Sequence, residues 1–180
     1  MIFYPILAVA LFLALVVQFF IPPIPWLHEA RVLVLPVVFF YGAFALPFWG
    51  MLVLAFLAGF MWDALTVQIV DSSVEISLGW SIILYAVLGG IMNGFRPLFL
   101  RGRWEIHCLL SGICTSILVL VEYLMLTLRR TGFDFSPEVW WRIGGSGILA
   151  VLLSPLVFFF LNWVGAKVGF DPHPEEKPVF

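Results

Sequence analysis

Six long apolar runs, each carrying almost no charge, restrict this chain to one folding environment. A helix of about 20 apolar residues crosses the ~30 Å hydrocarbon core of a bilayer. Hydrophobic residues make up 63% of the 180 residues and charged residues 11%, whereas soluble domains carry about 45–50% and about 25%. So few charges cannot cover a water-exposed surface. We therefore predict an all-α integral membrane protein, a bundle of about six transmembrane helices.

Prolines, arginines and short polar stretches separate the predicted spans. The spans are Phe3–Ile21, Arg31–Leu46, Phe48–Leu65, Leu78–Phe95, Trp104–Leu128 and Val139–Val164. Little more than Pro47 separates the second from the third, which predicts a tight helical hairpin. Residues 1–168 thus form one transmembrane domain, and the proline-rich polar segment 169–180 is predicted to be a short mobile tail.

The charges outside the spans predict an orientation. Arg96, Arg101 and Arg103 crowd one short loop, and such basic loops stay in the cytoplasm. The segment 66–75 has acidic residues and no basic one, which suits the outside. The first apolar run has no Lys or Arg before it and no cleavage site ahead of Pro22, so we interpret it as a retained span. We predict a multi-pass membrane protein with both termini in the cytoplasm.

Asp63 is an acid near the end of the third predicted span. A carboxylate at the centre of a membrane helix costs about 2.5–3.5 kcal/mol on insertion scales, so it needs a partner or an interface. Gly59, four residues earlier, shares its helix face and permits the close approach of another helix. Asp63 is therefore either a structural polar lock or partner contact, or an interfacial acid that reaches the headgroups.

Polar side chains follow one side of the fifth predicted span. They are His107, Ser111, Thr115 and Glu122. Their spacing places them along one helix face, and such a face points into a bundle or toward another protein. One hypothesis is a proton or ion path, which would need matching acids on other spans. The other is a set of hydrogen bonds that hold helices together, worth about 0.6 kcal/mol each on average.

Small residues at helical spacing indicate close helix packing. Gly90 and Gly94 form a GxxxG pattern in the fourth span. The sixth span is crowded with Gly144, Gly145, Ser146, Gly147 and Ala150. Packing within the chain is the favoured interpretation, and a docking face for a second membrane protein is the alternative.

No catalytic, metal or cofactor site is predicted. The sequence has no HExxH, GxSxG or P-loop pattern and no Asp-rich repeat that could hold a divalent metal. Cys108 and Cys114 fit neither a redox nor a zinc motif. The net charge of −2 offers no basic surface for nucleic acid. We therefore expect a protein that is not an enzyme, binds no cofactor and no nucleic acid, and has membrane lipid as its surroundings.

With the spans placed, the chain resembles the rod shape-determining protein MreD family over residues 1–168. The matching features are the Ala45–Pro47 end of the second span, the Gly59–Leu65 segment with its glycine and aspartate, the Leu120–Tyr123 segment with Glu122, the Phe135–Trp140 segment, and Pro155 in the last span. The proline-rich acidic tail and the lack of a charged N-terminal lead depart from that family's pattern.

The resemblance implies a non-catalytic scaffold or regulator of the cell-elongation machinery, which directs rod shape and lateral peptidoglycan synthesis. It implies MreC, a single-span membrane protein, as the partner. It also implies a larger assembly with RodA, a class B penicillin-binding transpeptidase and MreB. We expect the partner to contact small-residue and aromatic surfaces, together with the segment Thr131–Trp141, which offers Phe133, Phe135 and Trp140.

The family's fold is similar to the substrate-capture subunits of energy-coupling-factor vitamin transporters. That similarity supplies the alternative function. A capture subunit would need a ligand cavity, which Trp80, Tyr85, Asp63 and Glu122 could line.

Overall fold

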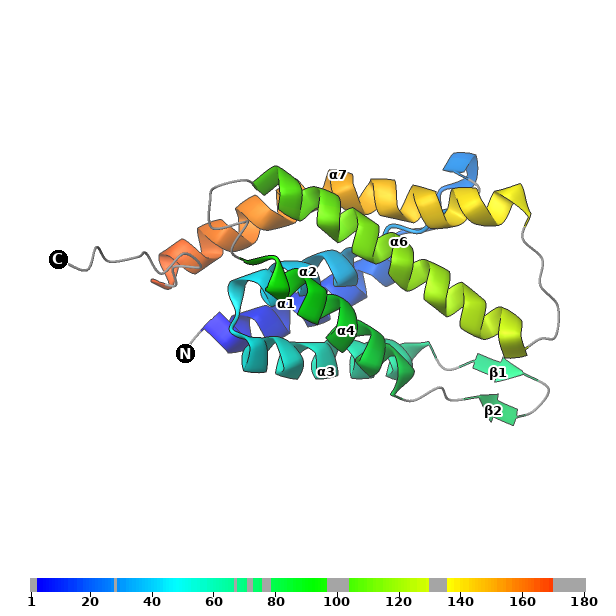
Figure 1. The fold of residues 1–180 in the computed structure, drawn as a ribbon, viewed down its shortest axis with the longest axis horizontal. Helices are drawn as coiled ribbons and strands as arrows, with labels where there is room; N and C mark the ends of the chain where they lie inside the picture. The colour runs from blue at the N-terminus through cyan, green and yellow to red at the C-terminus, as the bar shows by residue number, and fades with distance from the viewer. Residues whose placement is uncertain are drawn as a thin grey trace.

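A computed structural model of the chain describes residues 3–27, 29–66, 68–70, 73–75, 79–96, 104–129 and 136–169. Within these residues the fold is a helical bundle with one short strand pair (Figure 1). The helices are α1 (Phe3–Phe20), the 3-10 turn η1 (Pro25–Leu27), α2 (Val34–Ala45), α3 (Phe48–Leu65), α4 (Trp80–Gly94), α6 (Trp104–Arg129) and α7 (Pro137–Lys167). Each predicted span overlaps one of the six described α-helices, Phe48–Leu65 matches to the residue, and α6 and α7 extend slightly beyond their predicted limits. The predicted mobile tail lies mostly outside the described residues.

Four of the described helices, α1, α3, α6 and α7, are long and apolar enough to cross a membrane. This indicates a membrane protein. The second and fourth predicted spans correspond to shorter apolar helices, α2 with 12 residues and α4 with 15. At 1.5 Å per residue, α2 is about 18 Å long and α4 about 22 Å, both shorter than the ~30 Å hydrocarbon core.

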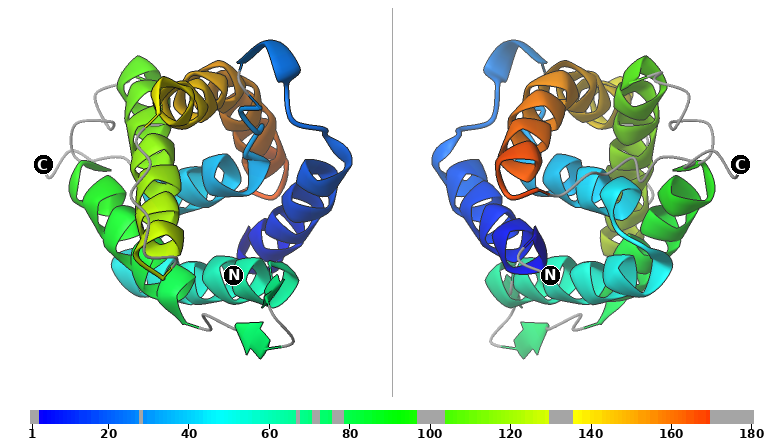
Figure 2. Two further views of the ribbon diagram at one scale, coloured as in Figure 1. Left: turned by 90° about the vertical axis from the view of Figure 1, so that its right-hand side faces the viewer. Right: turned by 90° about the vertical axis from the view of Figure 1, so that its left-hand side faces the viewer.

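The short helix α2 is the centre of the bundle. It contacts α1, α3, α4, α6 and α7, which surround it in the end-on views (Figure 2). Eleven of its 12 residues are buried, among them Phe39, Phe40 and Phe44. Tertiary contacts therefore replace lipid around α2, as expected for a 10–14-residue apolar helix.

Polar side chains at two positions fix the ends of α2. Near its start, the Leu35 amide donates a 3.0 Å hydrogen bond to Gln18 Oε1 on α1. Near its end, Asn93 Nδ2 on α4 donates to the carbonyl oxygens of Ala43 and Leu46 at 2.7 and 2.9 Å. Pro47 then precedes α3, which confirms the tight hairpin predicted at this residue.

The segment between α3 and α4 contains secondary structure that the sequence did not predict. Strands β1 (Gln68–Val70) and β2 (Ser73–Glu75) pair antiparallel, with Gln68 opposite Glu75. Strands of three residues are too short to show the alternating apolar pattern by which strands are predicted from sequence.

The bundle has two distinct ends (Figure 1). Helix α1 begins, α7 ends, and α4 leads into α6 at the same end. The opposite end carries the strand pair and the turn η1. Exposed tryptophans occur at both, with Trp26 and Trp141 at the strand end and Trp49 and Trp163 at the other. Tryptophan prefers the boundary between headgroups and acyl chains, so two such belts fit a membrane-embedded bundle.

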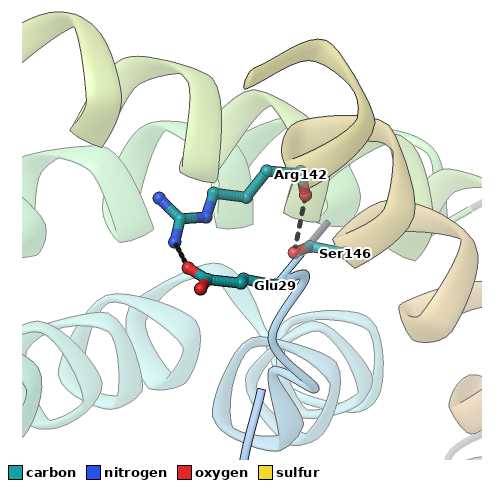
Figure 3. A network of polar contacts seen from close by, with 3 residues as sticks. All are labelled: Glu29, Arg142 and Ser146. Atoms are coloured by element: carbon teal, nitrogen blue, oxygen red, sulfur yellow. Dashed lines mark hydrogen bonds and ion pairs between the residues drawn. The ribbon is translucent and has the colours of Figure 1, made fainter. Parts of the chain in front are cut away.

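A bent segment before α2 is fastened to α7. Ile24 and Ala30 form an isolated bridge, and Glu29 between them adopts φ 62°. Arg142 Nη2 donates to Glu29 Oε2 at 2.8 Å, while Ser146 Oγ donates to the Arg142 carbonyl (Figure 3). Both charged side chains are substantially exposed, so this ion pair contributes little to stability, about 0.2–1 kcal/mol.

We predict that Glu29→Gly is more stable than Glu29→Ala. Both substitutions remove the ion pair with Arg142, but only glycine adopts the φ of 62° without steric cost. The expected difference is about 1–2 kcal/mol, measured as the free energy of unfolding in detergent. Equal stabilities would show that the backbone at this residue relaxes.

Candidate functional site

Asp63 caps a neighbouring helix. It lies near the end of α3 with a relative exposure of 5%, and its Oδ2 accepts a 2.7 Å hydrogen bond from the Gly79 amide. Gly79 directly precedes α4 and has φ 100°, in the left-handed region that glycine adopts readily. The first amides of a helix lack intrahelical partners, and the helix dipole favours a carboxylate there. This geometry favours the polar lock over an acid that faces the headgroups.

Gly59 lies where α3 and α4 approach most closely. A Cβ atom on Gly59 would come within 2.5 Å of the backbone N and Cα of Ile82. Backbone cannot move aside as a flexible side chain can. The close approach predicted for Gly59 is thus confirmed, and it keeps Asp63, one turn later, beside the start of α4.

Glu122 comes to the same cluster from α6. The Trp62 side chain on α3 lies near its carboxylate as a possible donor, while Oε1 is buried with no hydrogen-bond partner among the described residues. Tyr85 on α4 is fully buried, and its hydroxyl likewise lacks a described partner. Asp63, Tyr85 and Glu122 are close enough to interact electrostatically. We call these residues, with Trp62, the acidic cluster.

The predicted polar stripe of α6 faces the bundle interior. His107, Ser111 and Thr115 are all buried. His107 packs against the rings of Tyr41, Phe44 and Phe158, at centroid distances of 6.4, 5.6 and 5.5 Å. Thr115 Oγ1 donates to the Ser111 carbonyl of its own helix. That bond does not connect two helices, so the hypothesis of interhelical hydrogen bonds was wrong for Thr115.

Two glycines of α7, Gly145 and Gly147, pack within the chain, as the sequence suggested, whereas a Cβ on Gly144 would meet no described atom within 4 Å. A Cβ on Gly147 would meet the Gly112 carbonyl oxygen at 3.0 Å, and a Cβ on Gly112 would meet the Gly147 carbonyl oxygen at 2.8 Å. This reciprocal contact lets α6 and α7 cross closely. Gly145 packs against Leu27 and Ala30 of the bent segment. The sequence analysis had not singled out Gly112, although its helical spacing to Thr115 and Ser116 was a usable signal.

The GxxxG pair of α4 behaves differently. Cβ atoms added to Gly90 and Gly94 would meet no described atom within 4 Å. The favoured interpretation, packing within the chain, was therefore wrong for these two glycines among the described residues. No described part of the chain covers their face of α4.

Of the candidate residues near the start of α7, Trp140 alone lies among the described residues. Trp140 lies in the first turns of α7 and is 57% exposed. Phe133 and Phe135 lie outside the described residues. No group of three or more His, Cys, Asp or Glu side chains that could hold a metal ion occurs in the described part of the chain. Sequence reasoning missed Gln18 and Asn93, the two residues that bond to α2, although each is an amide within an apolar run.

No protein-family model, no curated protein and no solved structure matches this chain.

Proposed function

We propose that this chain is a non-catalytic membrane scaffold of the MreD type, which holds a single-span partner of the MreC type within the cell-elongation machinery. RodA, a class B penicillin-binding transpeptidase and MreB would join through that complex. The support from the sequence is the ordered set of motifs over residues 1–168. The support from the structure is that polar side chains in the apolar helices hold the bundle together. Gln18, Asp63 and Asn93 all form hydrogen bonds with the backbone of neighbouring helices or helix ends.

The observation that carries the proposal is the open face at Gly90 and Gly94. Small residues let two membrane helices approach closely, and among the described residues nothing occupies this pair. The lipid-facing side chains around it, Val87 and Ile91, are 56% and 44% exposed. A partner helix packed here would bury apolar surface without altering the bundle.

We propose that the end shared by the start of α1 and the end of α7 is cytoplasmic. Arg96, just after α4, lies in the basic segment 96–103 that joins this end of α4 to α6. Basic residues in short loops are retained in the cytoplasm of bacteria. The membrane would then be the bacterial inner membrane.

The double substitution Gly90→Leu and Gly94→Leu tests the scaffold. We expect an unchanged melting temperature of the isolated protein, because the added side chains meet open space. We also expect loss of the MreC-type protein of the same organism from a mild-detergent purification of the tagged chain, and loss of rod shape when the variant is the only copy. Gly144→Leu is the matched control, since Gly144 on α7 is equally open. Full recovery of the partner by the double variant would reject α4 as the contact.

A second candidate is a substrate-capture subunit of a vitamin transporter. The observation in its favour is that three of the four residues predicted to line a cavity, Asp63, Tyr85 and Glu122, gather in the acidic cluster. Trp80, the fourth, is 36% exposed. A vitamin that co-purifies with the isolated chain and is lost in Glu122→Ala would replace the scaffold proposal with this one.

A further inference from the structure

The acidic cluster contains two carboxyl groups and no described cation. Asp63 comes from α3 and Glu122 from α6, and the other groups that face them are Tyr85 of α4 and Trp62 of α3. The described basic residues with a known contact are engaged elsewhere, Arg142 with Glu29 and Lys167 over the Trp163 ring. Two neighbouring carboxylates in a low-dielectric site repel each other and seldom both ionise.

The two acids differ in their hydrogen-bond partners. Asp63 has the Gly79 amide at 2.7 Å and the N-terminus of α4, both of which stabilise a negative charge. Among the described residues Glu122 has only the Trp62 side chain nearby as a possible donor, and its Oε1 has no described donor. An ionised Glu122 would thus leave a charged oxygen buried without compensation, which is among the costliest arrangements in a protein interior.

The space around Glu122 limits what can neutralise it. Neither Glu122 Oε1 nor the Tyr85 hydroxyl has surface open to water. A hydrated ion or a water molecule needs room for at least one water-sized sphere. A proton needs no such room. When it binds, it converts Oε1 from an unpaired acceptor into a hydroxyl that can donate a hydrogen bond.

We propose that Glu122 is a buried proton-binding site, neutral in the folded protein, beside the carboxyl group of Asp63. The proton removes an uncompensated charge from the cluster and so holds α3, α4 and α6 together. Its removal would leave a buried negative charge between these helices and loosen their contact. The packing of this part of the bundle is therefore linked to proton concentration, independently of any partner protein.

Infrared spectroscopy of the purified full-length protein in nanodiscs tests the proposal. At neutral pH we expect the carbonyl band of a protonated carboxyl group, present in the wild type and in Glu105→Gln, and absent in Glu122→Gln. Glu105 is the matched control because it is an exposed glutamate on the same helix. A band that survives Glu122→Gln but disappears in Asp63→Asn would place the proton on the wrong acid. Absence of the band in the wild type would reject the site altogether.

Thermal unfolding gives a second readout that does not depend on the band. We expect the melting temperature of the wild type and of Glu105→Gln to fall between neutral and alkaline pH, because the folded state holds a proton that the unfolded state releases. Glu122→Gln should keep near wild-type stability at neutral pH and lose most of this fall. A fall of unchanged size in Glu122→Gln, or stabilisation of the wild type by sodium in place of the pH effect, would overturn the proposal. The partner-recovery experiment above is unaffected by either result.

Discussion

Replacement of Gly59 by leucine is expected to abolish the native packing of α3 against α4. Even the Cβ of the new side chain would lie 2.5 Å from the backbone of Ile82, and a backbone clash inside a packed bundle cannot relax locally. We expect a loss of at least about 3 kcal/mol, at or above the upper range for overpacked cores. The measurement is the fraction of protein that stays monodisperse after detergent extraction, with the melting temperature of whatever remains.

Gly90→Leu is the control for this substitution. It introduces the same side chain on the facing helix α4, at a glycine with no described atom within 4 Å of its added Cβ. The isolated variant should melt like the wild type. If Gly59→Leu were equally stable, the approach of α3 to α4 would be adjustable and its assignment as a fixed contact would be wrong.

Asp63→Ala is expected to destabilise the start of α4. The substitution leaves the Gly79 amide without its acceptor, and an unsatisfied buried donor costs about 1–3 kcal/mol. Asp63→Asn keeps an oxygen that can accept from this amide, so it should retain part of that free energy. Glu175→Ala, in the C-terminal tail, should have no effect. The measurements are the free energy of unfolding and the protein's abundance in the membrane.

The order of stabilities decides between the two interpretations of Asp63. A polar lock predicts wild type above Asn and Asn above Ala. Three indistinguishable proteins would mean that the hydrogen bond to Gly79 contributes nothing and that Asp63 serves only an external contact.

The sequence predicted the helices well because lipid imposes a simple rule, about 20 apolar residues per crossing. Helix-breaking and helix-capping residues indicated where helices end and begin. Pro47 marks the hairpin, and Ser136 and Pro137 mark the start of α7. The rule failed for α2, because apolar composition does not distinguish a helix wrapped by other helices from one wrapped by lipid. Only its contacts with five other helices show that α2 is surrounded by protein and not by lipid.

The candidate site was predictable in part. Gly59 and Asp63 share a face by spacing alone, and an acid in an apolar run must find a partner. The identity of that partner, Gly79, was hidden because a backbone amide carries no sequence signal. For Gly90 and Gly94 the spacing predicted packing within the chain, but Cβ atoms added there meet no described atom within 4 Å; spacing alone does not specify which helix packs against such a pair. The joining of Glu122 to Asp63 depends on how α6 crosses α3, which no local pattern encodes.

The enclosed helix α2 has a consequence for biosynthesis. It leaves the ribosome after α1, yet α4, α6 and α7, which supply much of its surroundings, are made after it. A helix of about 18 Å is too short to be held stably across the lipid by itself. The nascent chain must therefore keep this segment at the insertion machinery until its later neighbours arrive, so chains truncated before α6 should be cleared by membrane proteases.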